Sequence, residues 1–237
     1  MGLKESGLRG SLRNVSVGID AIPDSQGTHQ WNHDEGSGTT LGDAIGSLDG
    51  SISGATWLTD AGAGDAYLDY DGSDDTTELG TVSQSEFTHF TENAQGTIFA
   101  WINPDATDSD RSIFTSGRSS NDVQISFEIA SGELQILLGD GSGSYMVNTS
   151  GGSVSTDVWQ PAAFTCDGST ARLFLGDPIS EVASASTSGG TSNDLTAPVE
   201  FGNAKFDGGQ DLIWTDNVAR SQSSLQDFID SSSEFYE

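Results

Sequence analysis

The sequence predicts an all-β protein: an antiparallel β-sandwich of the jelly-roll type, with one short C-terminal helix and an N-terminal arm. Short apolar segments recur at intervals of about ten residues, and clusters of turn-forming residues separate them. In addition, 30 of the 237 residues are glycine, which is roughly twice the usual ~7% and favours turns over helices. We divide the chain into an arm and linker, residues 1–25, and a β-sandwich domain, residues 26–237.

The first twenty residues differ in charge from the rest of the chain. Lys4, Arg9 and Arg13 outnumber Glu5 and Asp20, so three basic minus two acidic residues leave +1 in a chain of net charge −28. The apolar residues that close this segment alternate with polar ones, as in a strand. We therefore expect Lys4, Arg9 and Arg13 to dock the arm on a neighbouring acidic surface. The alternative is a frayed terminus.

The segment that organises the domain is residues 67–79. Residues 67–70 are predicted to form a strand, 71–74 a tight turn and 76–79 the returning strand of a hairpin. The aspartates of the turn accept backbone hydrogen bonds, and Gly72 adopts positive φ without a Cβ clash. Further strands are expected at residues 29–33, 51–58, 97–103, 111–115, 123–130, 133–138, 158–165, 171–175, 179–186, 198–201 and 210–214.

Three local patterns refine this outline. Apolar and polar residues alternate strictly over residues 123–129, which predicts a strand with one face in water. Ser131 and Gly132 form a two-residue turn into the next strand, and Glu128 and Glu133 beside it are expected to face solvent. Residues 139–155 are rich in glycine and serine and suit an exposed loop or a sheet edge. Only residues 221–230 show helical spacing, with Ser221 as the N-cap.

The charge balance restricts the function. With 36 acidic and only 8 basic residues, the surface repels itself at ordinary ionic strength, and concentrated salt removes that repulsion. We interpret the chain as a salt-adapted protein; an ordinary acidic secreted protein is the alternative. The charge argues against nucleic-acid binding, which needs cationic residues to displace counterions from phosphates. No apolar run is long enough for membrane insertion, and Cys166 alone cannot form an intrachain disulfide.

The ordered motifs resemble the laminin-G-like jelly roll of the concanavalin A-like lectin/glucanase superfamily over about residues 29–230. The resemblance is carried by Trp31 with residues 35–40, by 54–57, by 68–75, by 97–102, by Trp159, by 167–169 before 173–175, and by 209–213. Pro161 and Cys166 depart from the family's usual residues without threatening the fold. The head of the chain, residues 10–16 and 21–25, resembles structural proteins of haloarchaeal viruses and proviruses.

One structural calcium ion is the cofactor that the resemblance implies, because some members of the family hold one. Asp71, Asp74 and Asp75 offer hard carboxylate oxygens in a turn, and Asp211 lies on the strand that matches the family's last one. Turn capping and surface charge explain the same side chains more simply. His29 and His33 form a second, weaker metal candidate, with Asp34 and Glu35 nearby.

Catalytic patterns are missing from the sequence. Enzymes with this fold use a Glu-x-Asp-x-x-Glu run, and no glutamate here has an aspartate two positions later. Cys166 has no histidine or basic neighbour to activate it, so we expect a packed, inert thiol. We predict a non-enzymatic protein; a salt-adapted glycoside hydrolase is the weakest alternative.

Ligand recognition has a single candidate in the sequence. Tyr145, in its Gly/Ser-rich segment, is the one aromatic residue expected to be exposed for stacking on a sugar. The four tryptophans in strand patterns are expected in a core: Trp57, Trp101, Trp159 and Trp214.

Two functions remain open. The first is a surface protein of a halophilic virus particle (a turret, decoration or fibre component) that assembles as a homo-oligomer on other virion proteins through its arm. It would contact a host glycan or glycoprotein. The alternative is a carbohydrate-binding module of a haloarchaeal cell-surface or secreted protein. The corresponding locations are the virion surface and the extracellular face of a halophile.

Overall fold

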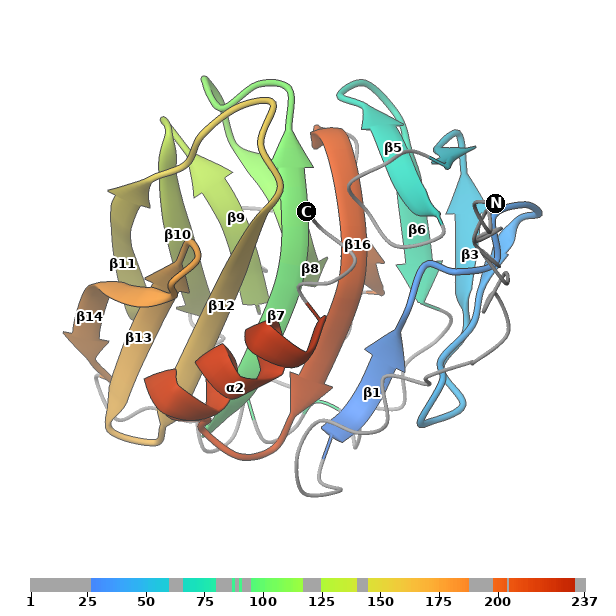
Figure 1. The fold of residues 1–237 in the computed structure, drawn as a ribbon. Coiled ribbons are helices and arrows are strands. Elements are labelled where there is room, and N and C mark those ends of the chain that lie inside the picture. Colours follow the sequence, from blue (N-terminus) through green and yellow to red (C-terminus); the bar gives the residue numbers. More distant parts are fainter. Residues whose placement is uncertain are drawn as a thin grey trace, which may run out of the picture.

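The chain is described by a computed structural model over residues 27–59, 66–79, 87, 90, 95–116, 125–139, 145–187, 198–203 and 205–232. The predicted arm, with Lys4, Arg9 and Arg13, lies outside these residues. The described residues form two eight-stranded antiparallel sheets packed face to face (Figure 1). The predicted all-β sandwich with a short C-terminal helix is therefore confirmed.

Sheet 1 has the strand order β14-β13-β12-β7-β16-β5-β4, and β1 pairs with the far part of β16. β16 is its central strand: residues 207–210 pair with β5, and residues 213–216 pair with β1. The strands of sheet 1 are β1 (Gly27–Trp31), β4 (Thr56–Leu58), β5 (Tyr67–Asp71), β7 (Gln95–Pro104), β12 (Gln160–Asp167), β13 (Thr170–Leu175), β14 (Ser180–Ser186) and β16 (Asp207–Asp216).

Sheet 2 has the order β11-β10-β9-β8-β15-β6-β3-β2. The predicted turn at Ser131 and Gly132 joins β9 to β10, and the positive φ of both residues (52° and 83°) is the twist that a tight two-residue hairpin requires. The strands of sheet 2 are β2 (Thr40–Leu41), β3 (Gly50–Ser53), β6 (Thr76–Leu79), β8 (Arg111–Ser116), β9 (Ile125–Ala130), β10 (Glu133–Gly139), β11 (Tyr145–Ser153) and β15 (Val199–Phe201).

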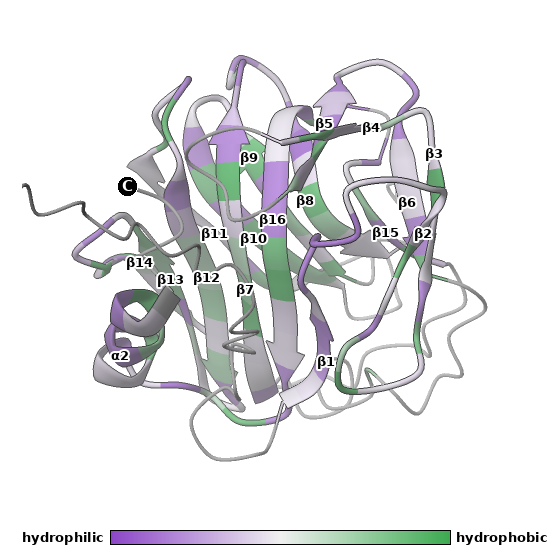
Figure 2. Cartoon of the chain, turned by 45° about the vertical axis from the view of Figure 1, so that its right-hand side comes forward, coloured by the Kyte–Doolittle hydropathy of each residue, from purple (hydrophilic) through white to green (hydrophobic). Residues whose placement is uncertain are grey.

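The space between the sheets is filled by one large hydrophobic core, whose members include Trp31, Leu68, Ile102, Phe127 and Phe201. Along β7 and β12, apolar residues occur on both faces of the strand. Figure 2 shows hydrophobic positions along these strands in the interior of sheet 1. Two covered faces explain these nearly continuous apolar runs, because a strand with one wet face would alternate.

Helix α2 (Gln222–Ser232) covers the outer face of sheet 1 (Figure 1). Phe228 packs edge to face on Phe99 and Trp214, with ring centres 5.1 and 5.3 Å apart, and Leu225 and Ile229 complete this second core. The predicted N-cap is confirmed, because the backbone N–H of Ser224 donates to Ser221 Oγ at 3.2 Å.

The predicted hairpin of residues 67–79 is wrong in its pairing. Both strands exist within a residue of their predicted bounds, but β5 pairs with β4 and β16 in sheet 1, whereas β6 pairs with β3 and β15 in sheet 2. Residues 72–75 therefore form an arch that carries the chain from one sheet to the other. The same correction applies to residues 51–58, which form β3 and β4 in different sheets, joined at Gly54 with a φ of 85°.

The expected wet face of β9 is also wrong. Ser126 and Glu128 are 3% and 6% exposed, and Ser126 Oγ donates to Glu128 Oε2 at 2.6 Å. Glu133, by contrast, is exposed as predicted. Among the described residues, no helix is both long and apolar enough to cross a membrane.

Candidate functional site

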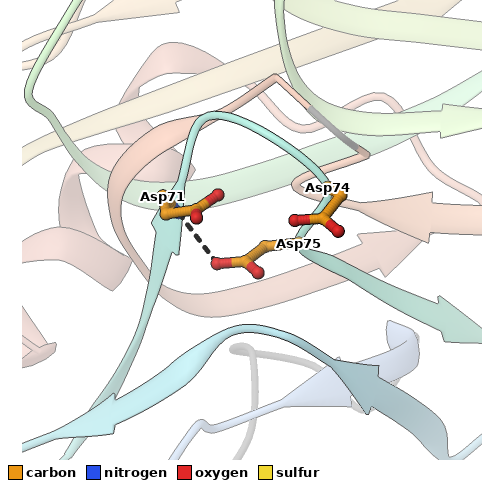
Figure 3. A group of neighbouring side chains, drawn as sticks. All are labelled: Asp71, Asp74 and Asp75. Carbon is orange, nitrogen blue, oxygen red and sulfur yellow. Dashed lines mark hydrogen bonds between the residues drawn. The ribbon is translucent and has the colours of Figure 1, made fainter.

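The arch between β5 and β6 holds three of the four predicted calcium ligands. Asp71, Asp74 and Asp75 each bring a carboxylate oxygen within 4.8 Å of the others (Figure 3). Asp75 also accepts the backbone N–H of Asp71 at 2.8 Å, which holds the arch closed. Burial, together with the charges of Asp71 and Asp74, raises the pKa of Asp75. Three hard oxygens at one point fit the donor chemistry of calcium.

Asp211, the fourth predicted ligand, lies elsewhere. It is buried in β16 opposite Trp101, and its Oδ1 accepts the backbone N–H of Leu212 at 2.6 Å. Leu212 has a positive φ of 40° at the irregularity where β16 changes its partner from β5 to β1. Asp211 thus stands beside a bend in the central strand, and the three-carboxylate group does not include it.

The two histidines of the weaker metal candidate have different hydrogen-bond partners. His29 Nδ1 is hydrogen-bonded to Asp43 Oδ2 at 2.6 Å. Although burial acts in the opposite direction, this bond and three backbone N–H donors lower the pKa of Asp43 to about 2. His33 lies beyond the end of β1, fully buried, and burial lowers its pKa to about 4.

The outer face of sheet 1, beside the surface that α2 covers, carries an aromatic pair. Tyr67 and Trp159 meet edge to face with ring centres 5.2 Å apart, and both side chains are partly exposed. Gly209 lies directly beneath them, because a Cβ at that position would come within 2.9 Å of the Trp159 ring and 3.0 Å of the Tyr67 ring. Glycine at this point of β16 lets both rings lie down against the sheet. We call Tyr67, Trp159 and Gly209 the aromatic platform.

Polar side chains flank the platform on both sides. Asp69 on β5 and Asn103 on β7 lie directly opposite Gly209 in the register, so all three share the outer face. Asn103 Oδ1 is buried and has no hydrogen-bond partner within the described residues. Burial first, and then the charges of Asp105 and Asp207, raise the pKa of Asp69. The apolar surface continues to Leu58, which is 37% exposed and lies opposite Tyr67.

Aspartates form a rim beyond the platform. Asp207 lies opposite Asp71, and the backbone N–H of Asp105 donates to Asp207 O at 2.8 Å. Arg111 pairs with this rim, with Nη1 3.8 Å from Asp207 Oδ2 and Nη2 2.8 Å from Asp108 Oδ1. Its Nη1 also donates to Lys205 O at 2.7 Å, so Arg111 ties the rim loops together.

A separate hollow of about 330 Å³ lies at the N-terminus of α2, between Arg172, Arg220 and the floor residue Phe174. Arg172 is bound by Asp167 at 3.0 Å, and Arg220 by Asp216 at 2.5 Å. Both guanidinium groups are thus neutralised by carboxylates of the chain itself, and the hollow offers no uncompensated positive charge to a ligand.

The other residues singled out in the sequence are Cys166, Tyr145 and four tryptophans. Cys166 is buried, as predicted for a packed thiol, and burial raises the pKa of its thiol. Tyr145 begins β11 at the edge of sheet 2, but its side chain lies outside the described residues. Trp101 and Trp214 are in a core as predicted, whereas Trp57 and Trp159 are only partly buried.

The sequence does not indicate the platform, because its pattern places Trp159 inside a strand over residues 158–165. β12 begins at Gln160, so Trp159 comes directly before the strand, and its side chain is partly exposed. Gly209, next to a strand expected to begin at residue 210, was the available signal, because glycine within a strand indicates the close approach of another group.

The fold has relatives among solved structures. The receptor-binding domain of botulinum neurotoxin C/D mosaic serotype matches with a TM-score of 0.68 and 12% identity, over 86% of this chain and 51% of that one. The binding domain of botulinum neurotoxin DC in complex with rat synaptotagmin II matches with a TM-score of 0.68 and 13% identity, over 89% and 52% of the two chains. The chain thus spans about half the length of these toxin domains.

A shorter relative matches over nearly its whole length. This relative is domain 4 of AbnA, an extracellular arabinanase from Geobacillus stearothermophilus, and its structure is a complex with arabinotriose. It matches with a TM-score of 0.60 and 16% identity, over 86% of this chain and 98% of that one. At these identities the likeness shows the fold alone. None of the three is a virion protein, so the resemblance of the head to viral proteins stays a prediction.

Sequence comparison gives the family. No curated protein sequence matches the chain. A family model does, over residues 71–224, from the end of β5 to the first turn of α2. This span covers well over half of the chain and includes strands of both sheets. The chain belongs to the concanavalin A-like lectin/glucanases superfamily.

Proposed function

We propose that this chain is a non-enzymatic carbohydrate-binding domain that holds a glycan on the outer face of sheet 1. The observation that carries the proposal is the aromatic platform, in which Tyr67 and Trp159 lie over Gly209 and remain partly exposed. An aromatic ring offers the apolar C–H face of a sugar a large contact surface at little entropic cost. Leu58 extends that surface along the same face.

Hydrogen-bonding groups stand where the edge of a stacked sugar would lie. The partly exposed carboxylate of Asp69 would accept a hydroxyl proton on one side of Gly209, and the partly exposed side chain of Asn103 stands on the other. An apolar contact area with a few fixed polar groups is the usual composition of a small-molecule site. The glycan complex of AbnA domain 4, on the same fold, supports this assignment.

The location proposed for the domain is the extracellular face of a salt-adapted cell, in line with its charge of −28. The virion role predicted first draws no support from the described residues, because Lys4, Arg9 and Arg13 lie outside them. The calcium ion at Asp71, Asp74 and Asp75 is proposed as a structural ion of the arch.

The test is a glycan array followed by titration calorimetry with the best neutral oligosaccharide. Trp159→Ala and Tyr67→Ala are each expected to weaken binding by about tenfold or more, as for aromatic anchors of other interfaces. Trp159→Phe keeps a ring and should retain part of the affinity. Ile45→Ala removes an exposed apolar side chain away from the platform and serves as the matched control.

Two results would refute the proposal. One is an array without a bound glycan; the other is a bound glycan whose affinity is unchanged in Trp159→Ala and Tyr67→Ala. The non-enzymatic character is tested separately, by incubating the bound oligosaccharide with the protein for a day. We expect its chain length to stay unchanged, and release of new reducing ends would show a glycosidase.

A further inference from the structure

We infer that the aromatic platform accepts neutral glycans and rejects acidic ones, and that Asp69 and Asp105 impose this choice. The inference rests on the proposed function and names the ligand class of that site. Gly209 and the two rings above it carry no charge, so the charges around them decide which ligands the platform accepts.

Carboxylates approach the platform from several elements of sheet 1. Asp69 is directly opposite Gly209 on β5, and its side chain is partly exposed. Asp105 follows the end of β7, two residues after Asn103, and the negative charges of Asp105 and Asp207 act on Asp69 more strongly than those of Asp75 and Asp71. Asp157 joins this group from the segment before Trp159, where its backbone N–H donates to Pro104 O at 3.0 Å.

Positive charge does not balance this group. In the described part of the chain, the cation that forms ion pairs with the rim is Arg111, which lies 2.8 Å from Asp108 and 3.8 Å from Asp207. Lys205, two residues before Asp207, is exposed and forms no ion pair with a described carboxylate. The Arg111 guanidinium also donates to Lys205 O, and the Arg111 side chain is 11% exposed. Arg111 is therefore held inside the rim and cannot turn toward a ligand on the platform without breaking these contacts.

An acidic sugar on the platform would place its carboxylate or sulfate among these aspartates. Like charges brought together without a compensating cation oppose binding, and they discriminate between ligands of the same shape. A neutral sugar gains from the same carboxylates, because its hydroxyl groups donate hydrogen bonds to them. Asp69 and Asp105 are thus specificity-determining residues, whereas Tyr67, Trp159 and Asn103 supply the contact.

The experiment compares ligand pairs that differ only in charge. Lactose with sialyllactose, and methyl-esterified trigalacturonate with trigalacturonate, are titrated at pH 7 with EDTA and again with calcium chloride. We expect the neutral member of a bound pair to bind about tenfold more tightly in both buffers. In Asp69→Asn with Asp105→Asn, that ratio should fall, by roughly threefold for each charge removed.

Asp227→Asn, on the exposed side of α2, removes one charge away from the platform and should leave the ratio unchanged. Melting curves show whether each variant is folded. Equal affinity for both members of a pair would overturn the inference, as would a ratio that the double variant leaves intact; neither result would touch the proposed function. Failure to bind any neutral or acidic glycan would overturn both.

Discussion

Tyr70 and Thr77 join the two sheets by a buried hydrogen bond beside the arch. The Tyr70 hydroxyl lies 2.9 Å from Thr77 Oγ1, with one residue on β5 of sheet 1 and the other on β6 of sheet 2. Thr77 is fully buried and Tyr70 is 1% exposed. Since the arch of residues 72–75 lies between them in sequence, this bond fixes how the arch closes.

Removing the hydroxyl should weaken the sandwich. We expect Tyr70→Phe to lower the free energy of unfolding by about 1 to 2 kcal/mol, because the buried Thr77 hydroxyl loses its partner. Chemical denaturation of the variant and the wild type measures the difference.

A double-mutant cycle separates the bond from other effects of the substitution. Thr77→Val removes the other partner, and the double variant should cost less than the sum of the two single variants. Strict additivity would show that the hydrogen bond contributes nothing to stability.

His33 makes stability depend on pH between about 6.5 and 4. Burial lowers its pKa in the folded state from 6.5 to about 4. In this window the unfolded chain binds a proton that the folded chain excludes, so stability falls as the pH falls. Between pH 7 and pH 4.5 the loss from this residue should be about 2 to 3 kcal/mol.

His33→Asn isolates this contribution, since asparagine tolerates the positive φ of 57° at this position. Unfolding free energies of both proteins are measured at several pH values. The aspartates contribute equally to the pH dependence of both proteins, so the difference between the two curves reports His33 alone. A wild-type curve parallel to that of the variant would contradict the assignment.

Calcium should stabilise the arch. A ligand that binds only the folded state stabilises it by about 2.7 kcal/mol when its concentration is 100 times its Kd. We therefore expect calcium chloride to raise the melting temperature above that in EDTA at equal ionic strength. In Asp74→Asn, which removes one of the three clustered carboxylates, the rise should be lost.

Nonspecific screening is the competing explanation for such a rise. Asp227→Asn lowers the charge equally without touching the arch, and magnesium screens as calcium does. A rise of equal size in Asp74→Asn, or with magnesium, would mean that the carboxylates at the arch hold no specific ion.

Dilution of salt should destabilise the protein. The screening length grows from ~3 Å at 1 M to ~10 Å at 0.1 M salt, and 36 acidic residues face only 8 basic ones. The melting temperature should therefore fall as sodium chloride is lowered below about 0.5 M. At pH 3.5 the dependence should weaken, because many carboxylates are then protonated. A melting curve indifferent to salt at pH 7 would exclude a salt-adapted surface.

The sequence predicted the local structure and not the partners of the strands. Ser131 with Gly132, and Ser221 before α2, are signals that depend on neighbours a few residues away, and both turned out as expected. The arch at residues 72–75 has the same local pattern as a hairpin. β16 draws β5 into sheet 1 and β15 draws β6 into sheet 2, and both partners lie more than a hundred residues later in the chain.

The candidate site was predicted only in part, for the same reason. The three aspartates of the arch are close in sequence, so their grouping could be foreseen. Tyr67, Trp159 and Gly209 come from three distant segments, and only the register of the sheet brings them together. At Glu128 a local pattern misled the prediction: the alternation of residues 123–129 indicated a face in water, but the fold buries this side chain.

The position of β16 in the middle of sheet 1 has a consequence for synthesis on the ribosome. Within the described residues, β5 and β7 do not pair with each other and are joined in sheet 1 through β16, so the sheet cannot connect these two strands until β16 has emerged. Pairing over such sequence distances is slow. Until β16 has emerged, the nascent chain therefore carries unpaired strand edges, and repulsion between the carboxylates of neighbouring copies opposes their aggregation.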